Sequence, residues 1–378
     1  MTRIKADWLE DAASQTVCRL LTDAGYQAWF VGGCVRNALL GAPVADLDIS
    51  TDAHPEKVMK LAAAAGIKSI PTGVDHGTVT LVLNDIPFEV TTFRRDVATD
   101  GRRATVAFAD NIEDDARRRD FTMNALYADA EGRIADPLGG LPDLHAQHVR
   151  FIEDPAQRIK EDYLRILRFF RFYAWYGDPN EGPDRDGLAA CAEHIDGLQS
   201  LSVERVTAEM LKLLGASDPA PALAAMASTG ALAQVLPGAD AGVLPVLVHL
   251  EQENTIAPDA LRRLAVIGGQ PGEALRLSKH QARRLEQINS NAGPAEVAYR
   301  FGADAGRDAL LVTAASLGQP ATPNELRAIT HAAEQVFPLK AADLMPALSG
   351  AVLGDALKQA EVRWIASGFT LTKADLLE

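Results

Sequence analysis

The chain has 378 residues, of which 47% are hydrophobic and 23% are charged, and its formal net charge is −14 at pH 7. This length predicts two or three domains, and the composition is that of a globular protein rather than a disordered one. The negative net charge argues against a protein that coats nucleic acid without specificity, although it leaves room for a local basic surface.

Cysteine usage and apolar patterning exclude further classes of protein. Cys18, Cys34 and Cys191 are far apart, with no C-x-x-C pair, so neither a disulfide framework nor a zinc site is expected. The longest apolar runs are too short for a membrane span, and the N-terminus lacks the apolar core of a secretory signal. We therefore expect a cytoplasmic protein with no zinc and no membrane partner.

The first 145 residues alternate between helical and strand-like patterns. Residues 1–27 have the apolar spacing of an amphipathic helix. Short strands are expected in 28–33 and 46–51, and a helix runs from Pro55 to Gly66. Residues 78–93 predict two strands that are joined by a turn at Asn84–Asp85. Together these segments predict a small domain with a mixed sheet.

The pattern changes after residue 145. Residues 154–177 are strongly helical, with apolar side chains on one face and charges on the other. A loop follows at 176–187, and from there to the end only helical patterns rich in alanine and leucine are found. We expect an α+β fold in which a mixed-sheet head precedes a long helical remainder, so that the chain is mostly α overall.

Two acidic residues stand near the start of the second predicted strand. Asp46 and Asp48 are two apart, so their side chains project from the same face of the strand. Carboxylates that close repel one another unless a cation lies between them, and Glu89 on another strand can complete the set. Oxygen ligands of this kind favour Mg²⁺, and two such ions can span an attacking hydroxyl and a leaving pyrophosphate. The alternative is a strand that merely ends in exposed acids.

A glycine pair precedes these acids. Gly32 and Gly33 follow a predicted strand and open a predicted helix, where backbone N–H groups can cradle phosphate oxygens. Arg36 can add a bidentate contact. The glycine pair, the arginine and the D-x-D pattern fall in this order within seventeen residues, which favours a phosphate cradle that faces a metal site.

Four motifs in order carry a family resemblance: "GGCVRNALLG…DLDIST", "RRDFTMNAL", "EDYLRILRFFRF" and "SVERVTAEM". Together they resemble the bacterial (class II) tRNA CCA-adding nucleotidyltransferases and their poly(A) polymerase relatives, over residues 25–215. The resemblance implies a nucleotidyltransferase head at 1–145, a helical neck that selects the base at 146–215, and a helical body and tail that bind tRNA at 216–378.

The resemblance also implies roles for the residues of the first two motifs. Asp46 and Asp48 would hold the catalytic Mg²⁺, with Glu89 as the third acid, and the triphosphate would meet the glycine turn and its arginine: Gly32, Gly33 and Arg36. Ribose and phosphates would be handled by four residues of the second motif: Arg118, Arg119, Asp120 and Asn124. Asp120 is expected at the ribose 2′-hydroxyl. The alternative for this stretch is a helix N-terminus capped by Asp120 or Thr122.

The third motif contains the expected base-selecting pair. Asp162 and Arg165 are three apart on a predicted helix and so share a face. Cytosine and adenine each present an amino donor beside a ring-nitrogen acceptor, which a carboxylate and a guanidinium can match, whereas uracil and guanine present the reverse. Arg168 is also expected at the nucleotide. The alternative is an i,i+3 ion pair on a solvated helix.

Three further features follow from the resemblance. Glu204, Arg205 and Glu209 would brace the base-selecting helix. Asp100–Arg103 resembles a mobile loop that switches the pocket from CTP to ATP, although it is about a residue short and lacks a tyrosine often found there. Asn37 stands where the family usually has aspartate, and we expect activity to survive this change.

The expected function is template-independent addition of C, C and A to the tRNA 3′ end, from CTP and ATP, with release of pyrophosphate by a two-metal mechanism. A poly(A) polymerase and a partial enzyme that adds only CC or only A share the catalytic motifs and stay open as alternatives. A noncatalytic RNA-binding module is a further alternative, against which the intact pair of Asp46 and Asp48 speaks.

Overall fold

The structure is a computed structural model that describes residues 2–100, 103–345 and 347–378, and side chains outside 96–106. Contacts divide the chain into two compact units. The N-terminal unit comprises Met1–Leu201 with Ser228–Gln234, and the C-terminal unit comprises Ser202–Ala227 with Val235–Glu378. All the candidate residues of the nucleotide and metal site lie in the N-terminal unit. No helix in the described part of the chain is both long enough and apolar enough to cross a membrane.

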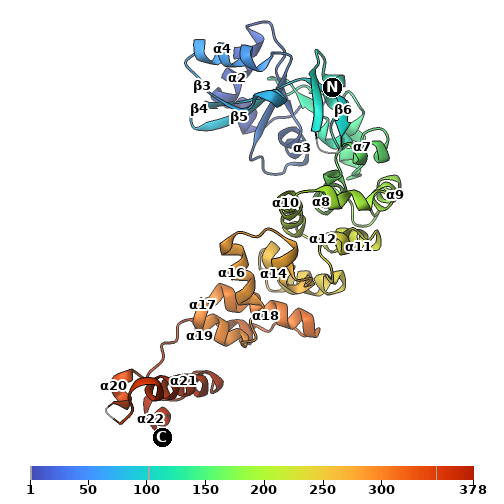
Figure 1. The fold of residues 1–378 in the computed structure, drawn as a ribbon. Coiled ribbons are helices and arrows are strands. Elements are labelled where there is room, and N and C mark those ends of the chain that lie inside the picture. The colour runs from blue at the N-terminus through green and yellow to red at the C-terminus, as the bar shows by residue number, and fades with distance from the viewer. Residues whose placement is uncertain (1, 101–102, 346) are drawn as a thin grey trace. The chain divides into compact units, whose positions relative to one another are not determined.

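A seven-stranded mixed sheet forms the centre of the N-terminal unit, with strand order β3-β4-β5-β2-β1-β8-β9 (Figure 1). Strands β2 and β5 pair in parallel, and every other neighbouring pair in this sheet is antiparallel. The strands are β1 (Trp29–Val31), β2 (Leu47–Thr51), β3 (Lys68–Gly73), β4 (Thr78–Leu83), β5 (Ile86–Thr92), β8 (Tyr127–Ala128) and β9 (Ile134–Ala135). The predicted mixed sheet is confirmed.

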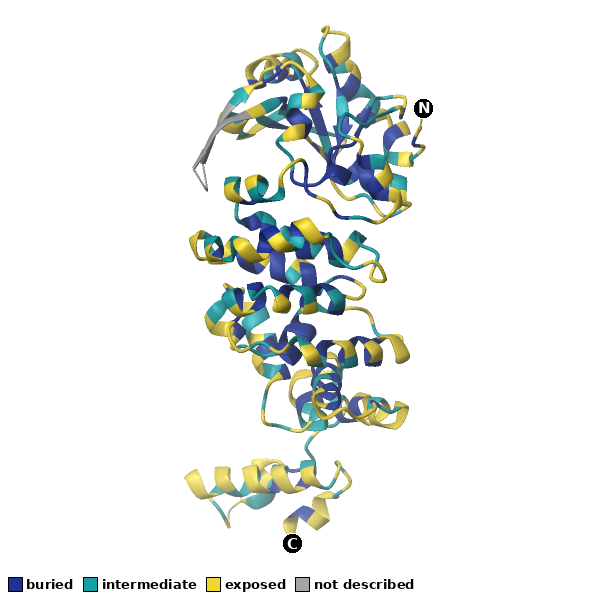
Figure 2. Cartoon of the chain, turned by 90° about the vertical axis from the view of Figure 1, so that its right-hand side faces the viewer, coloured by how far each residue is buried: buried dark blue, intermediate teal, exposed yellow. Residues whose placement is uncertain are grey.

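The β4–β5 hairpin shows why the central strands form. Asn84 and Asp85 have φ values of 52° and 62°, and these two residue types tolerate such a left-handed turn between antiparallel strands. Along β5, Phe88 and Val90 are buried while Glu89 is exposed, as strand alternation requires. Figure 2 shows the buried residues gathered on the strands at the centre of this unit.

Helices cover the sheet. They are α1 (Asp7–Glu10), α2 (Ala12–Thr22), α3 (Gly33–Leu40), α4 (Pro55–Ala64), α5 (Ile112–Arg117) and α6 (Gly140–His145). The single helix expected in residues 1–27 is wrong, because Asp11 is extended and its side chain accepts a hydrogen bond from Ala13 N at 2.8 Å, which starts a new helix.

A separate two-stranded ribbon consists of β6 (Arg94–Asp100) and β7 (Arg103–Phe108). The sequence analysis did not predict these strands. The segment Asp100–Arg103, which resembles a mobile loop, falls at the end of this ribbon, and its residues 101–102 lie outside the described residues. Its role therefore stays a prediction.

The helices after the sheet pack around an aromatic cluster. They are α7 (Pro155–Glu161), α8 (Leu164–Tyr176), α9 (Arg185–Glu193) and the 3-10 helix η3 (Ile195–Ser200). Phe151 lies 4.9 Å from Phe121 and 5.4 Å from Phe169, measured between ring centres, and Phe172 lies 5.0 Å from Phe121. These rings fix α8 against the segment that follows α5, since aromatic pairs at such distances stabilise packing beyond the area they bury.

Helices make up most of the described residues of the C-terminal unit, as the sequence predicts. Its elements are α10 (Val203–Leu214), η4 (Ala241–Val243), α13 (Leu244–Glu253), α14 (Ala260–Ile267), α15 (Pro271–Ala274), α16 (Lys279–Ile288), α17 (Pro294–Phe301), α18 (Ala303–Leu317), α19 (Pro323–Ala333), α20 (Ala341–Leu344), α21 (Gly350–Ala366) and α22 (Lys373–Leu377). The chain passes between the units in α11 (Ala220–Ser228) and α12 (Ala231–Val235).

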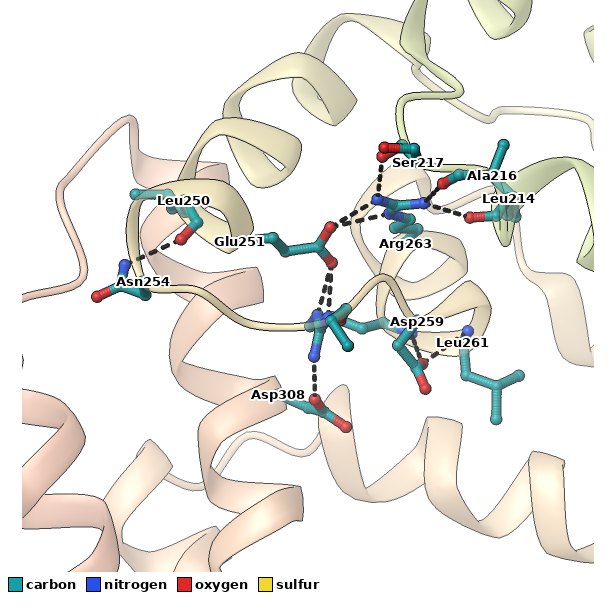
Figure 3. A network of polar contacts seen from close by, with 12 residues as sticks. Leu214, Ala216, Ser217, Leu250, Glu251, Asn254, Asp259, Leu261, Arg263 and Asp308 are labelled. Atoms are coloured by element: carbon teal, nitrogen blue, oxygen red, sulfur yellow. Dashed lines mark hydrogen bonds and ion pairs between the residues drawn. The ribbon is translucent and has the colours of Figure 1, made fainter. Parts of the chain in front are cut away.

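A buried ionic network ties the helices of this unit together (Figure 3). Glu251 is 1% exposed and accepts hydrogen bonds from both Arg262 and Arg263. Arg263 is fully buried and also donates to the carbonyl of Leu214 at 2.7 Å. Arg262 continues to Asp308 at 2.8 Å. One carboxylate on α13 therefore connects α14 to the end of α10, while Arg262 reaches α18.

Candidate active site

The two aspartates of the D-x-D pattern lie at the start of β2. Asp46 directly precedes the strand and is exposed, and Asp48 is the second strand residue and is partly buried. Leu47 and Ile49 are buried at 8% and 0% exposure. The strand therefore turns its apolar side chains inward and its two acids to the opposite face.

Glu89 reaches the same place from the neighbouring strand. In the parallel pairing of β2 with β5, Asp48 and Glu89 are direct Cα partners. Paired residues on neighbouring strands, about 4.8 Å apart, point to the same face of the sheet. Two central strands thus bring these carboxylates to one face of the sheet, from segments about forty residues apart in the chain.

The electrostatics of Asp48 reflect this crowding. The pKa of Asp48 is raised to about 6, mainly by burial and then by repulsion from Glu89 and Asp46, while Arg119 opposes the rise. Such mutual repulsion is what a bound cation relieves. The donors are all carboxylate oxygens, which fits a hard divalent ion.

No group of three or more His, Cys, Asp or Glu side chains among the described residues is placed so that it could hold a metal ion by itself. Mg²⁺ does not need one, because it keeps several waters and shares substrate phosphates, so a few carboxylates are enough. Asp46, Asp48 and Glu89 are therefore the residues that could hold a hard divalent ion together with substrate phosphates.

The glycine turn follows β1, which is the neighbour of β2 in the sheet. Gly32 has φ 72° and ψ −121°, a conformation that side chains rarely allow, and it begins α3. Its N–H donates to the carbonyl of Leu126 at 3.3 Å, so the following N–H groups at the helix start are the ones left for an anion. A Cβ at Gly32 would lie 3.5 Å from Nη1 of Arg119. Arg119 is thus in contact with the turn and within electrostatic reach of Asp48.

Arg118 and Arg119 share one buried partner, Asp115. Arg118 Nε donates to Asp115 Oδ1 at 2.8 Å, and Arg119 Nη2 donates to Asp115 Oδ2 at 3.0 Å. Burial alone would raise the pKa of Asp115, but the two guanidiniums hold it well below its usual range. The sequence analysis did not identify Asp115, although it lies only three residues before the motif.

Arg36 is an internal residue rather than an exposed one. It is 6% exposed, and its Nη1 donates to Asn124 Oδ1 at 2.5 Å. Its Nη2 donates to the hydroxyl of Tyr176 at 2.7 Å and to Asn37 Oδ1 at 2.9 Å. Burial lowers the pKa of Arg36, which the contact with Tyr176 opposes. The side chain expected at the triphosphate therefore connects α3 to the end of α8.

Asn37 uses both ends of its amide. Its oxygen accepts from Arg36, and its Nδ2 donates to the carbonyl of Pro43 at 2.7 Å. An aspartate at this position could accept from Arg36 but could not donate to Pro43. Asn37, which departs from the family pattern, thus makes a hydrogen bond to Pro43 that an aspartate could not make.

Asp120, Asn124 and Arg168 form a second network. Asp120 Oδ1 accepts from the N–H of Phe121 and from Asn124 Nδ2, each at 2.9 Å. Its Oδ2 accepts from Arg168 Nε at 2.6 Å and is also ion-paired with Arg168 Nη2. Burial opposes ionisation, but Arg168 and Asn124 lower the pKa of Asp120 to about 2. These four contacts occupy all the lone-pair positions of the Asp120 carboxylate.

The helix-capping alternative for this stretch is wrong. A 3-10 turn, η2 (Thr122–Asn124), follows Phe121 and has no side-chain cap. Thr122 instead donates to Asp143 Oδ2 at 2.5 Å. The polar side chains here serve the tertiary network, because the turn is too short to leave a row of free N–H groups.

The single helix expected over 154–177 breaks at the base-selecting motif. Asp162 is extended, with φ −153°, and its Oδ1 accepts from Leu164 N at 3.1 Å, which ends α7 and starts α8. The expectation that Asp162 and Arg165 share a face of one helix is therefore wrong. Arg165 donates to Glu161 Oε2 at 2.6 Å and to the carbonyl of Arg118 at 2.8 Å. The pair stands at a helix junction that is hydrogen-bonded to the "RRD" segment.

Three further expected residues lie on α10 in the other unit. Glu204 is exposed and lies 3.4 Å from Arg276 Nε, and Glu209 is buried at 6% exposure. Arg205 is partly buried. Their bracing role stays a prediction.

Several residues that organise the site were missed. Ser50 lies two residues after Asp48 and accepts from Arg119 Nη2 at 3.3 Å, a position that strand alternation alone indicates. Tyr127 and Glu161 are buried or half-buried partners of arginines in the motifs. Tyr176 ends an aromatic helix and carried no sequence signal for a contact with Arg36.

Comparisons with known proteins agree with this geometry. The family model for the poly A polymerase head domain matches residues 28–150, and the model described as "Probable RNA and SrmB- binding site of polymerase A" matches residues 183–242. The chain is 40% identical over 201 residues to the mitochondrial CCA tRNA nucleotidyltransferase 1 of Mus musculus, covering 53% of this chain and 46% of that protein. It is 41% identical over 224 residues to the CCA-adding enzyme of Geobacillus stearothermophilus, covering 59% of this chain and 54% of that protein.

Solved structures extend the likeness over the whole chain. The Bacillus stearothermophilus CCA-adding enzyme in complex with CTP has a TM-score of 0.75 and 28% identity, over 96% of this chain and 94% of that one. The Thermotoga maritima CCA-adding enzyme complexed with tRNA_CCA has a TM-score of 0.69 at 17% identity, which shows a shared fold. The sequence matches span about half the length of the curated relatives. Residues 28–150 therefore match the family of poly A polymerase head domains, and the chain shares its fold, over nearly all of its length, with a solved bacterial CCA-adding enzyme.

Proposed function

We propose that the chain is a template-independent RNA nucleotidyltransferase of the cytoplasm, which adds C, C and A to the 3′ end of tRNA. Its substrates are CTP and ATP, and pyrophosphate is released. The observation that carries the proposal is the register pair of Asp48 with Glu89, with Arg119 between these acids and the glycine turn. The CCA-adding names of the relatives support the choice of tRNA as the acceptor.

The acids of β2 and β5 and the glycine turn act on different parts of the triphosphate. Asp46 and Asp48 would hold Mg²⁺, with Glu89 as the third acid beside them. When bound, Mg²⁺ would neutralise phosphate charge and lower the pKa of the tRNA 3′-hydroxyl. Gly32, Gly33 and Arg119 receive the phosphate oxygens, because free helix-start N–H groups and a guanidinium complement the anion.

The second network handles the ribose. Asp120 receives the 2′-hydroxyl only when one of its four present donors is released. Arg168, whose side chain is 31% exposed, is the donor that can turn toward solvent, and it would then face the nucleotide. Arg36 and Asn124 hold the network in place beneath it, since both are at most 6% exposed.

Base selection falls to the junction between α7 and α8. Asp162 accepts the exocyclic amino group of cytosine or adenine, and Arg165 donates to the adjacent ring nitrogen. Uracil and guanine leave both groups unpaired, which costs about 1–3 kcal/mol for each. The helical neck (146–215) thus selects the base, while the body and tail (216–378) hold the tRNA by its shape.

The deciding experiment is incorporation of labelled CTP and ATP, separately and together, into tRNA truncated at three lengths within its CCA end. We expect CMP on the shorter ends, AMP only on the CC end, and a stop after A. Asp48→Asn should abolish incorporation while leaving tRNA binding intact, and Asp85→Asn, an exposed turn residue, serves as the matched control.

Each other outcome identifies a different function. Long adenylate tails on an unstructured oligoadenylate would make the chain a poly(A) polymerase. Addition of only CC or only A would make it a partial enzyme. Tight tRNA binding with no incorporation at all would leave an RNA-binding module and would overturn the proposal.

A further inference from the structure

Asp115 is the most enclosed carboxylate near the site. It lies on α5, is 0% exposed, and is surrounded by donors. Oδ1 is 2.8 Å from Arg118 Nε and 2.7 Å from Arg118 Nη2. Oδ2 is 3.0 Å from Arg119 Nη2 and 2.8 Å from the Tyr127 hydroxyl, and Ser50 Oγ lies 3.4 Å away. Every lone pair of this carboxylate is therefore committed to holding a side chain.

The same contacts leave one end of Arg119 unused. Its Nη2 is shared between Asp115 and Ser50, and its Nε donates to the Tyr127 hydroxyl at 3.3 Å. No hydrogen bond in the described part of the chain uses its Nη1, which is the atom that stands 3.5 Å from a Cβ placed on Gly32. The guanidinium is thus fixed on two sides and presents its third side to the glycine turn.

The net charge of this cluster also favours an anion at the glycine turn. One buried carboxylate faces two guanidiniums whose side chains are 13% and 18% exposed, so the cluster keeps one net positive charge beside the turn. Without the carboxylate, two cations would stand against each other in a half-buried site and would separate. A fixed excess of positive charge that faces free helix-start N–H groups is suited to an anion of several charges.

We propose that Asp115 is a positioning residue that holds Arg118 and Arg119 so that Arg119 Nη1 meets the triphosphate, and later the pyrophosphate, at the Gly32 turn. This inference rests on the proposed function. Asp115 does not touch the nucleotide, because its oxygens are enclosed. It acts through the two arginines, and Ser50 and Tyr127 complete the hold on Arg119.

The test compares Asp115→Asn with the wild-type full-length chain. Three quantities are measured: the KM for CTP, the inhibition constant of pyrophosphate, and the Kd for tRNA that lacks its CCA end. We expect the first two to rise together, by about 10- to 100-fold, as is typical when a carboxylate behind a ligand is removed. The Kd for tRNA should stay within about twofold of the wild type, since the substitution preserves volume and shape. Glu113→Gln, an exposed acid on the same helix, is the matched control.

A double-mutant cycle separates positioning from general damage. If Asp115 acts through Arg119, the effect of Asp115→Asn on pyrophosphate inhibition should largely vanish in an Arg119→Gln background. Full additivity would overturn the inference, as would unchanged pyrophosphate inhibition in folded Asp115→Asn. If Asp115→Asn does not fold, Tyr127→Phe replaces it as the test. This variant should raise the inhibition constant of pyrophosphate several-fold. An unchanged inhibition constant would overturn the inference. Wild-type incorporation tests the proposed function by itself, so the two failures are distinguishable.

Discussion

The guanidinium carbon of Arg36 lies 4.1 Å from the ring centre of Tyr176, while Arg36 Nη2 donates to the hydroxyl of the same tyrosine at 2.7 Å. Arg36 belongs to the glycine turn segment, and Tyr176 is the last residue of α8. This double contact connects the segment of the glycine turn to α8, the helix that begins after Asp162. Both ends of α8 are therefore tied to the head, because Arg165 binds the carbonyl of Arg118.

Truncations of Tyr176 should separate the two parts of this contact. Tyr176→Phe removes the hydroxyl and keeps the stacked ring, so the free energy of unfolding should fall by about 1 kcal/mol. Tyr176→Ala removes both and leaves Arg36 unsupported, so it should fall by about 2–4 kcal/mol. Urea unfolding of the full chain measures both values. Equal losses in the two variants would show that the stacked ring contributes nothing.

The metal-free protein should lose stability as pH rises through the titration of Asp48. The pKa of this acid is about 6 in the folded chain and near its ordinary value when unfolded, so the folded state binds more protons between about pH 4 and pH 6. The free energy of unfolding therefore falls across that window, by at most about 3 kcal/mol and less because Asp48 is partly exposed.

Urea unfolding in the presence of a chelator, at pH values on either side of this window, measures the loss. Asp48→Asn should flatten the profile, since an amide does not titrate. If the free energy of unfolding of Asp48→Asn falls with pH as steeply as that of the wild type, the loss comes from other residues. Added Mg²⁺ should restore stability above the window, because it binds the ionised form.

Alanine at the two glycines should have different consequences. Gly32 has a positive φ and a ψ near −121°, where a side chain is strained, so Gly32→Ala should cost about 1–3 kcal/mol. Gly33 is the first helical residue, and the nearest atom to an added Cβ is 3.8 Å away, so Gly33→Ala should be nearly neutral. Thermal unfolding of both variants tests this. Equal destabilisation would mean that crowding, rather than backbone strain, sets the cost.

The buried network of the C-terminal unit should be intolerant of charge removal. Glu251→Gln leaves Arg262 and Arg263 without their shared carboxylate, and breaking a buried pair in this way costs about 3–5 kcal/mol. Glu253→Gln changes an exposed glutamate on the same helix and should have almost no effect. The measurement is the denaturant midpoint of each variant. A Glu251→Gln protein as stable as the control would contradict the role of the network.

Arg165→Lys should relax base selection. Lysine keeps the charge but lacks the planar fork that reaches Glu161 and the carbonyl of Arg118, so its ammonium group cannot hold the same position. We expect the preference for CTP over UTP to fall about 10- to 100-fold, which corresponds to one or two unpaired groups. Lys160→Gln, on the exposed side of α7, is the control. Unchanged preference would place base selection elsewhere.

Much of the head could be predicted because its signals are local. The strands β1, β2, β4 and β5 follow from alternating apolar residues and from a two-residue turn. The strand β3 carries Pro71 and mostly exposed or half-buried side chains, so no alternation marks it. The strands β8 and β9 are two residues long and exist only through pairing with β1 and with each other.

Part of the candidate site could likewise be predicted from the sequence, and part could not. The acids on β2 and β5 follow from strand periodicity, and the resemblance adds the arginines of "RRDFTMNAL". Tyr176 contacts Arg36, 140 residues away in the chain, and no spacing rule encodes such a contact. Asp115 lies three and four residues before Arg118 and Arg119, a spacing typical of helical ion pairs, but spacing alone does not show that its carboxylate is buried. The break at Asp162 was hidden because a side-chain hydrogen bond to Leu164 N competes with the helix, while the apolar periodicity continues past it.

The parallel pairing of β2 with β5 has a practical consequence for protein engineering. Residues 52–85, which include α4, β3 and β4, connect these two strands, and the three acids keep their mutual register as long as the two paired strands keep their length. The exposed corner at Ala65–Gly66, after α4, is thus where a fluorescent reporter can be spliced into the chain. A single residue added inside β5 would instead rotate Glu89 into the hydrophobic interior and expel Phe88 or Val90 to the solvent.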